Sequence, residues 1–295
     1  MDHATLSEEQ VGPLVRAALE EDLGEGGDLT SMLVIPPGRR AEGRIFARRE
    51  GVVAGLPLAA AVFREVDGEI QVDCVLADGD RVAPGGDLLR LRGPARGILA
   101  GERTALNFLA RLSGVATMTR RCVDLARPFG AAILDTRKTT PGLRLLEKYA
   151  VAVGGGVNHR RGLFDQVLLK ENHFALAGAG EGGEGYRRTV ARAVQGGRPV
   201  EAEARNREQA LAAIEGGAAI ILLDNMAAGE MKTAVTAGRE LAGRLGRRVL
   251  FEASGGIGPE NLADLAATGV DRISLGALTH SVRPLDLSLL LEPPA

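Results

Sequence analysis

The segment AAILDTRK, residues 131–138, decides the fold of this chain. Its apolar half, Ala131 to Leu134, predicts a short buried strand, and the strand opens directly onto Asp135 and then onto a pair of basic residues. Charged residues that follow a buried strand must lie at an edge of its sheet, because the strand itself has no room for them. Later apolar runs in the chain also end in polar residues, so the arrangement of the strands decides whether these residues meet in one site.

Predicted strands and helices alternate strictly from residue 131 onward. Strands are expected at 131–134, 167–169, 200–204, 219–223, 249–253 and 272–275, and helices between them include 207–215, 230–245 and 259–267. Such alternation predicts parallel strands joined by crossover helices. It fits either a β/α barrel or an open doubly wound sheet. Polar residues follow nearly every strand, which favours the barrel, because an open sheet uses only the strand ends at its switch point.

The composition indicates an aliphatic core and a nearly neutral surface. Of 295 residues, 45% are hydrophobic but only 3% are aromatic, which is typical of a tightly packed α/β protein. A net charge of −2 predicts no binding to nucleic acid or to an anionic membrane, and no apolar run approaches the ~20 residues of a membrane span. Cys74 and Cys122 fit no metal or redox spacing, and Met1 to His3 do not begin a signal peptide. We therefore expect a cytoplasmic protein.

The first third of the chain predicts a mixed region of helices and short strands. Residues 7–23 have the apolar spacing of an amphipathic helix, with Ser7 and Gln10 placed as a capping box. Strand-like segments and one long helix follow, at 44–47, 70–75, 87–91 and 98–127. The long helix carries Leu99, Leu106, Leu109, Leu112 and Val115 down one side, and Arg103 lies away from that side.

Polar residues and glycines at the predicted strand ends would converge at the mouth of a barrel. They are Asp135, Thr136, Arg137, Lys138, Lys170, Asp224, Ser254, Gly255, Gly256, Ser274 and Gly276, with Leu275 between the last two. One polar residue after a strand is usually a solvated turn, but the same feature on six strands indicates a site. Glu201 and Glu203 share one face of their strand, and a carboxylate is rarely buried without a partner.

The segment from Ser254 to Gly258 predicts a phosphate site. It precedes Pro259, which would be a good first residue of a helix, so free backbone N–H groups and the positive end of a helix would face an anion there. Barrel phosphate sites recur in the loops after the last two strands, and Ser274 to Gly276 would supply the neighbouring edge.

The charges of the expected site fall into a basic group and an acidic group. The basic group is Arg137, Lys138, Arg160 and Lys170, with His159 beside them. Cations held together without an anionic guest repel one another by several kcal/mol, about 4 per pair at ~4 Å, so the group indicates a polyanionic substrate. The acidic group, Glu203 and Asp224, suits Mg²⁺ or sugar hydroxyls.

The segment from Asp135 to His173, together with EAEAR, ILLDNM, EASGGI and ISLGALTHS, resembles the carboxylating nicotinate-nucleotide pyrophosphorylases, also called quinolinate phosphoribosyltransferases. The resemblance covers nearly the whole chain, and the motif positions show no departure. It implies an α/β sandwich-like domain at 1–113, an incomplete parallel β/α barrel at 114–277, and a C-terminal segment at 278–295 that returns to the first domain. It also implies a homodimer, or a higher oligomer, whose sites combine both subunits.

The reaction implied by the resemblance joins quinolinate to phosphoribosyl pyrophosphate with Mg²⁺ present, releases pyrophosphate and carbon dioxide, and yields nicotinate mononucleotide for NAD synthesis. Catalysis would rest on Glu203, Asp224, Lys138 and Lys170, of which Glu203 and Asp224 would also face the metal and the ribose. Substrate-binding residues would be Arg103, Thr136, Arg137, Lys138, His159, Arg160, Lys170, Glu203, Asp224, Ser254, Gly255, Gly256, Ser274, Leu275 and Gly276.

Two other functions fit the same pattern of strand ends. A related phosphoribosyltransferase with another anionic acceptor would share these residues but need not keep every cation of the basic group. A non-catalytic barrel that binds phosphosugars would have no need of Glu203 and Asp224 beside the ribose.

Overall fold

The computed structural model describes residues 6–180 and 182–293, which divide into two compact units. The first combines the chain up to Arg120 with Leu145–Gly155 and with the chain from Val282 onward, and the second combines Arg121–Arg144 with Gly156–Ser281. The residues on which the signal-peptide argument rests, Met1 to His3, lie outside the described ones. The boundaries expected near residues 113 and 277 stay a prediction about domains.

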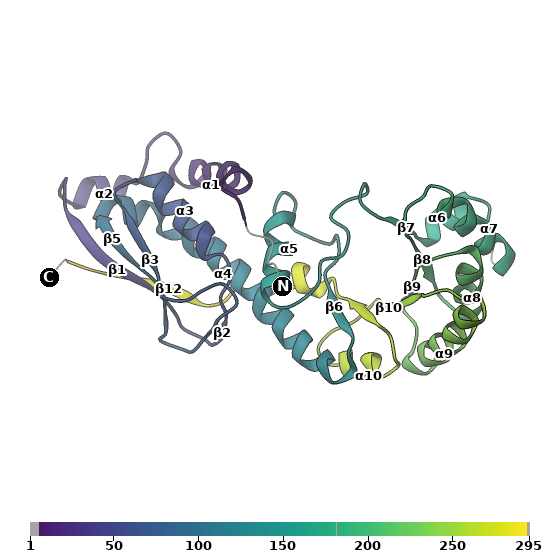
Figure 1. Cartoon of the computed structure of the whole chain (residues 1–295). Coiled ribbons are helices and arrows are strands. Elements are labelled where there is room, and N and C mark those ends of the chain that lie inside the picture. Colours follow the sequence, from purple (N-terminus) through teal and green to yellow (C-terminus); the bar gives the residue numbers. More distant parts are fainter. Residues whose placement is uncertain (1–5, 181, 294–295) are drawn as a thin grey trace. The chain divides into compact units, whose positions relative to one another are not determined.

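The first unit contains a four-stranded antiparallel sheet in the order β12-β1-β5-β3 (Figure 1). Its strands are β1 (Arg40–Ala47), β3 (Gln71–Cys74), β5 (Asp87–Pro94) and β12 (Leu287–Glu292). A small separate sheet pairs β2 (Gly51–Val52) with β4 (Arg81–Val82). The last strand of the chain thus pairs with the first.

Helices of the first unit include α1 (Glu8–Leu23), α2 (Leu29–Val34), α3 (Leu56–Val66) and α4 (Ala95–Ala126). The capping box expected at Ser7 and Gln10 is confirmed. The expected apolar side of the long helix is also confirmed from Leu106 to Val115, although Ile98 rather than Leu99 is the fully buried residue at its start.

The second unit is built on a parallel sheet in the order β6-β11-β10-β9-β8-β7. Its strands are β6 (Ala132–Leu134), β7 (Val167–Leu169), β8 (Val200–Ala204), β9 (Ile220–Asp224), β10 (Leu250–Ser254) and β11 (Arg272–Ser274). Among the described strands, β6 and β7 do not pair with each other, and on the edge of β6 that does not pair with β11 a single bridge joins Leu134 to Val157. The expected fold, an incomplete parallel β/α barrel with a smaller N-terminal domain, is confirmed.

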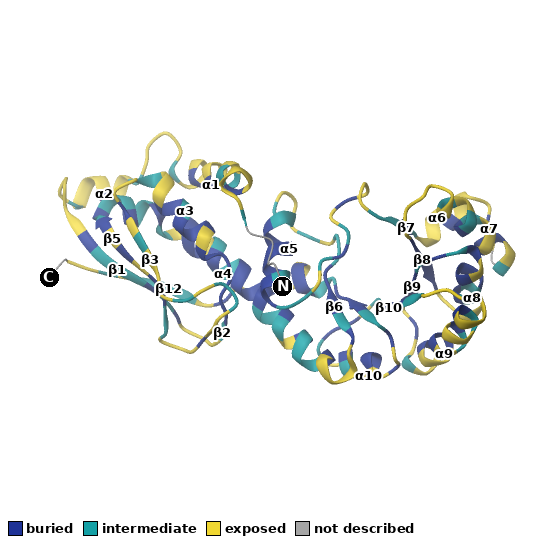
Figure 2. Ribbon diagram, viewed as in Figure 1, coloured by how far each residue is buried: buried dark blue, intermediate teal, exposed yellow. Residues whose placement is uncertain are grey.

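Helices cover one face of this parallel sheet. They include α7 (Gly183–Val194), α8 (Arg207–Gly216), α9 (Ala228–Arg244) and α10 (Leu262–Ala266). The strands beneath them are dark in Figure 2, whereas the outward sides of the helices are exposed. Shorter helical segments follow β7 and β11, namely α6 (Glu171–Leu176) and α11 (Ala277–His280), and η1 (Arg127–Phe129) precedes β6. All of α5 (Arg144–Val153) except its first residue belongs to the first unit. The opposite face of the sheet is therefore the one that can hold a site.

The start of α10 corrects one expectation. Pro259 lies in a turn, and the helix begins only at Leu262. Asn261 explains the delay, because its side chain accepts the backbone N–H of Gly258 and donates to the carbonyl of Gly256, which stabilises a turn in place of a first helical turn. A five-residue helix has little dipole to offer, so any anion site here must rest on the glycine loop.

Within the described residues, no helix is long and apolar enough to cross a membrane.

Candidate active site

Strand register places the expected site residues on one face of the parallel sheet. Glu203 pairs with Leu222, Leu222 with Glu252, and Glu252 with Arg272. Paired residues of neighbouring strands point the same way, and so do residues two apart in one strand. The face that carries Glu203 therefore also carries Asp224, Ser254 and Ser274, together with the deeper residues Glu201, Glu252 and Arg272.

The basic group contains two neighbouring arginines. Burial lowers the pKa of Arg160, and the nearby positive charge of Arg137 lowers it further, while the negative charges of Glu201 and Asp165 act in the opposite sense. Nε of Arg137 is buried and has no hydrogen-bond partner among the described residues. Two close cations, one with an unsatisfied buried donor, form a favourable place for a carboxylate or a phosphate.

The lysines of the basic group stand at the ends of β6 and β7. Lys170 is exposed at the N-cap of α6. Lys138 is also exposed, its backbone N–H donates to Oγ1 of Thr136, and its carbonyl accepts the hydroxyl of Thr279. A Cβ on Gly276 would come within 2.9 Å of Cδ of Lys138, so the glycine leaves room for the lysine side chain. Both ammonium groups remain available to a ligand.

The acidic group lies at β8 and β9. Glu203 is 7% exposed, and burial together with the charge of Asp224 raises its pKa, while Lys170 acts in the opposite sense. Nδ2 of Asn225 donates to Oδ2 of Asp224 at 2.9 Å, and Asn225 itself adopts a left-handed backbone with φ of 54°. Carboxylates that repel each other in this way suit a divalent cation, and their hard oxygen atoms match Mg²⁺.

The glycine loop after β10 needs its glycines. Gly255 has φ of +96°, and a Cβ there would overlap Oδ1 of Asn225. Gly256 has φ of +56° and open space around it. Ser254 and Ser274 stand at the adjacent ends of β10 and β11, and Leu275 is buried with its N–H bonded to the carbonyl of Leu134. The loop thus exposes backbone N–H groups beside hydroxyl groups, the donors expected for a phosphate.

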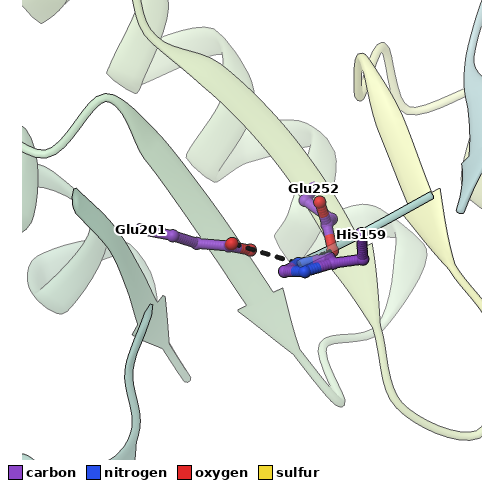
Figure 3. A group of neighbouring side chains, drawn as sticks. All are labelled: His159, Glu201 and Glu252. Atoms are coloured by element: carbon purple, nitrogen blue, oxygen red, sulfur yellow. Dashed lines mark ion pairs between the residues drawn. The ribbon is translucent and has the colours of Figure 1, made fainter. Parts of the chain in front are cut away.

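A buried cluster of charged side chains lies below these residues on the same face (Figure 3). Nε2 of His159 is 3.1 Å from Oε2 of Glu201 and 3.5 Å from Oε1 of Glu252. Nε of Arg272 is 2.9 Å from Oε2 of Glu252. Glu252 and Arg272 were not among the residues expected in the site. Alternation along a strand would have placed Glu252 on the face of Ser254 and Arg272 on the face of Ser274, because the members of each pair are two residues apart.

His159, Glu201 and Glu252 offer three metal-ligand atoms within 4.8 Å of one another, but the ring nitrogens argue against a metal. Burial lowers the pKa of His159, while hydrogen bonds to Glu201 and Glu252 raise it to about 9. Nδ1, however, accepts the backbone N–H of Arg160 at 2.7 Å, so a proton on Nδ1 would set two donors face to face. This bond opposes the effect of the carboxylates: while it is made, Nδ1 is bare, and Nε2 carries the proton where a metal would bind.

Arg103 belongs to the first unit. It is exposed on α4, away from the buried side of that helix, as its spacing predicted. Its expected contact with a ligand stays a prediction.

Two family models match nearly the whole chain. The model described as "Quinolinate phosphoribosyl transferase, C-terminal domain" matches residues 115–290, and the model of the N-terminal domain matches residues 28–113. The chain belongs to the quinolinate phosphoribosyl transferase family. The matched segments include every residue of the basic and acidic groups.

Relatives of the quinolinate phosphoribosyl transferase family match over most of their length. The Mycobacterium leprae protein named nicotinate-nucleotide pyrophosphorylase (carboxylating) is 44% identical, with 93% of this chain and 95% of that protein aligned. A chloroplastic rice protein of the same name is 39% identical over 95% of this chain and 77% of its own length. The solved structure of the nicotinate-nucleotide pyrophosphorylase from Francisella tularensis aligns with a TM-score of 0.89 at 36% identity and covers 99% of each chain.

Proposed function

We propose that the protein transfers the phosphoribosyl group of phosphoribosyl pyrophosphate to the ring nitrogen of quinolinate. The products are pyrophosphate, carbon dioxide and nicotinate mononucleotide, a precursor in NAD synthesis. One observation carries the proposal beyond the family match: a single unit brings the cations Arg137 and Arg160 close together and also places the carboxylates Glu203 and Asp224 near each other on its parallel sheet. Cations suit the anionic substrates, and carboxylates suit the sugar at which charge develops.

The basic group would bind the anions of both substrates. Arg137 and Arg160 suit the dicarboxylate, because planar guanidinium groups bind carboxylates through two parallel hydrogen bonds. Lys138 and Lys170 carry flexible exposed ammonium groups that can follow the pyrophosphate as it leaves. The 5-phosphate of the ribose would lie in the loops of Ser254 to Gly256 and Ser274 to Gly276.

The acidic group would act on the ribose. When the bond to pyrophosphate breaks, the anomeric carbon gains positive charge, and carboxylates placed beside it stabilise that charge. Glu203 and Asp224 would also hold Mg²⁺, which would neutralise charge on the pyrophosphate. After transfer, carbon dioxide leaves and the electron pair of the broken bond stays on the ring carbon, where the adjacent positively charged nitrogen stabilises it until that carbon takes a proton from water. Decarboxylation therefore needs little from side chains.

The assembly expected from the family resemblance is a homodimer with shared sites, in which Arg103 of each chain would reach the site of the partner subunit. The exposure of Arg103 on α4 supports this placement. We assign the protein to the cytoplasm, as its composition predicts.

The test is a comparison of acceptors. Purified protein with phosphoribosyl pyrophosphate and Mg²⁺ should release carbon dioxide and pyrophosphate with quinolinate and should leave nicotinate almost unused, because a site built for a second charged group rejects the analogue that lacks it. Equal turnover of both acids would contradict a site built for the second carboxylate of quinolinate. Binding of phosphoribosyl pyrophosphate without turnover of any pyridine acid would favour a phosphosugar-binding protein.

A further inference from the structure

Arg160 is held at both ends by a closed ring of hydrogen bonds. Its backbone N–H donates to Nδ1 of His159 at 2.7 Å, and its Nη1 donates to the carbonyl of Gln166 at 3.1 Å. The other ends of these two partners meet on one atom. Nε2 of His159 is 3.1 Å from Oε2 of Glu201, and Nε2 of Gln166 donates to the same oxygen at 2.7 Å.

This ring opposes a repulsion that is built into the site. Arg137 lies close enough to Arg160 to lower its pKa, while the charges of Glu201 and Asp165 act in the opposite sense. The two guanidinium groups still repel each other when no further anion lies between them. A free arginine side chain would relieve the repulsion by turning away, and the substrate would then have to reorder it on binding. Fixing the side chain beforehand removes that cost from the binding step.

We propose that Glu201 is a positioning residue, which holds Arg160 in place through His159 at the backbone and through Gln166 at the guanidinium. This inference rests on the proposed function, in which Arg160 binds the dicarboxylate. It also changes the expected role of His159. The ring is 8% exposed and both of its nitrogens bond to protein atoms, so His159 orients Arg160 instead of contacting the substrate itself.

The two carboxylate oxygens of Glu201 have different surroundings, which allows an experiment to separate its hydrogen bonds from its negative charge. Oε2 accepts both hydrogen bonds, while Oε1 is buried without a hydrogen-bond partner among the described residues. An amide can therefore replace the carboxylate, with its oxygen in the place of Oε2 and its NH₂ in the place of Oε1. Glu201→Gln should keep the ring, whereas Glu201→Leu, which is similar in size, removes both bonds.

The first measurement is the KM for quinolinate. Glu201→Leu should raise it roughly 10- to 100-fold, the cost of a misplaced substrate-binding group, with a smaller change in the KM for phosphoribosyl pyrophosphate. Glu201→Gln should stay within about threefold of wild type, because the positioning bonds remain. If both variants are impaired alike, Glu201 acts through its charge and the proposal fails.

A double-mutant cycle then tests the route through Arg160. Arg160→Ala alone should raise the KM for quinolinate, and Glu201→Leu added to it should raise the KM no further, because the group that it positions is already gone. Arg187→Ala on α7, where the arginine pairs with Glu184, is the matched control: in that background Glu201→Leu should keep its full effect. Additive losses with Arg160→Ala would overturn the proposal.

Two further measurements cover the remaining outcomes. If Glu201→Leu does not fold, Gln166→Met removes only the side-chain donor and should show a smaller rise in KM with the same dependence on Arg160; an additive rise would count against the proposal. Long-range ¹⁵N–¹H spectra of the ligand-free protein need no turnover. They should show Nδ1 of His159 bare and Nε2 protonated, and protonation of Nδ1 would refute the ring even in a protein that does not use quinolinate.

Discussion

Substitution of Gly255 by alanine should disturb the orientation of the Asp224 carboxylate through Asn225, which lies between them. A Cβ on Gly255 would overlap Oδ1 of Asn225 and come within 2.9 Å of its backbone nitrogen. Rotation of the Asn225 side chain can relieve the first contact but not the second, so the Asn225 backbone and amide must both shift. That amide donates to Oδ2 of Asp224 at 2.9 Å. We therefore expect the Asp224 carboxylate to lose its fixed orientation.

Two contributions set the expected losses of stability and of activity in Gly255→Ala. Alanine in a left-handed backbone costs about 1–2 kcal/mol, which is roughly 2–8 °C in melting temperature for a domain of this size. A hydrogen bond to a charged group contributes about 1.5–3 kcal/mol. If that bond acts fully in the transition state, its loss lowers kcat/KM roughly 10- to 100-fold.

Gly246→Ala separates the two contributions. Gly246 follows α9, has φ of +63° and has no neighbouring atom within 4 Å of a built Cβ, so its alanine variant carries the backbone strain alone. Steady-state kinetics and thermal melts of both variants should show a comparable or larger loss of stability for Gly255→Ala, and loss of activity for that variant only. In the double variant Gly255→Ala with Asn225→Gly, stability should partly return while activity should not. Wild-type kcat/KM for Gly255→Ala would refute the reasoning.

Three further predictions concern other parts of the chain. Glu203→Gln and Asp224→Asn should each lower kcat roughly 10²- to 10³-fold with only a small change in melting temperature, since the amide keeps the shape and loses the charge; a large fall in melting temperature with turnover intact would make these residues structural. Arg103→Ala and Lys170→Ala should each be nearly inactive. After the two variants are mixed at equal concentration, with subunit exchange verified, activity should return to roughly a quarter of wild type, because half of the dimers would be hybrids with one intact site of two. No recovery of activity would place Arg103 in the site of its own chain. The hydrogen bond from Arg44, at 2.6 Å, holds the pKa of Asp87 below its ordinary value of 3.8, so the stability that this pair contributes is present above pH 3.8 and is lost as the pH falls through the lowered pKa. Asp87→Asn should therefore lower the melting temperature at pH 7. A difference in melting temperature that persisted unchanged at pH 2 would contradict this account.

The sequence predicted the parts of the site that depend on a strand and the residue after it. Lys138, Lys170 and Asp224 follow buried strands, and alternation placed Glu201 on the same face as Glu203. These signals are local, because a period of two and a short apolar run fix where a side chain points. The family resemblance supplied the chemistry, which local patterns alone left open among three functions.

The rest depends on contacts between segments far apart in the chain. Nothing near Gln166 signals that its amide meets Glu201, which lies 35 residues away. The error at Pro259 has a local cause: a proline can start a helix, but the side chain of Asn261 bonds within residues 256–258 and holds them in a turn. The weak preference of proline for the first turn of a helix is outweighed here by two side-chain hydrogen bonds of Asn261, which the sequence alone does not predict.

The pairing of β1 with β12 sets an order of events during synthesis on the ribosome. One edge of β1 is completed only by Leu287–Glu292, so it waits while about 240 further residues are made. At roughly 5–20 residues per second, that delay lasts roughly 10 to 50 s. An unpaired edge strand can join another chain during such a wait. The nascent protein therefore has a long interval in which chaperones, or the neighbouring chains of a polysome, compete for the place that its own last strand will take.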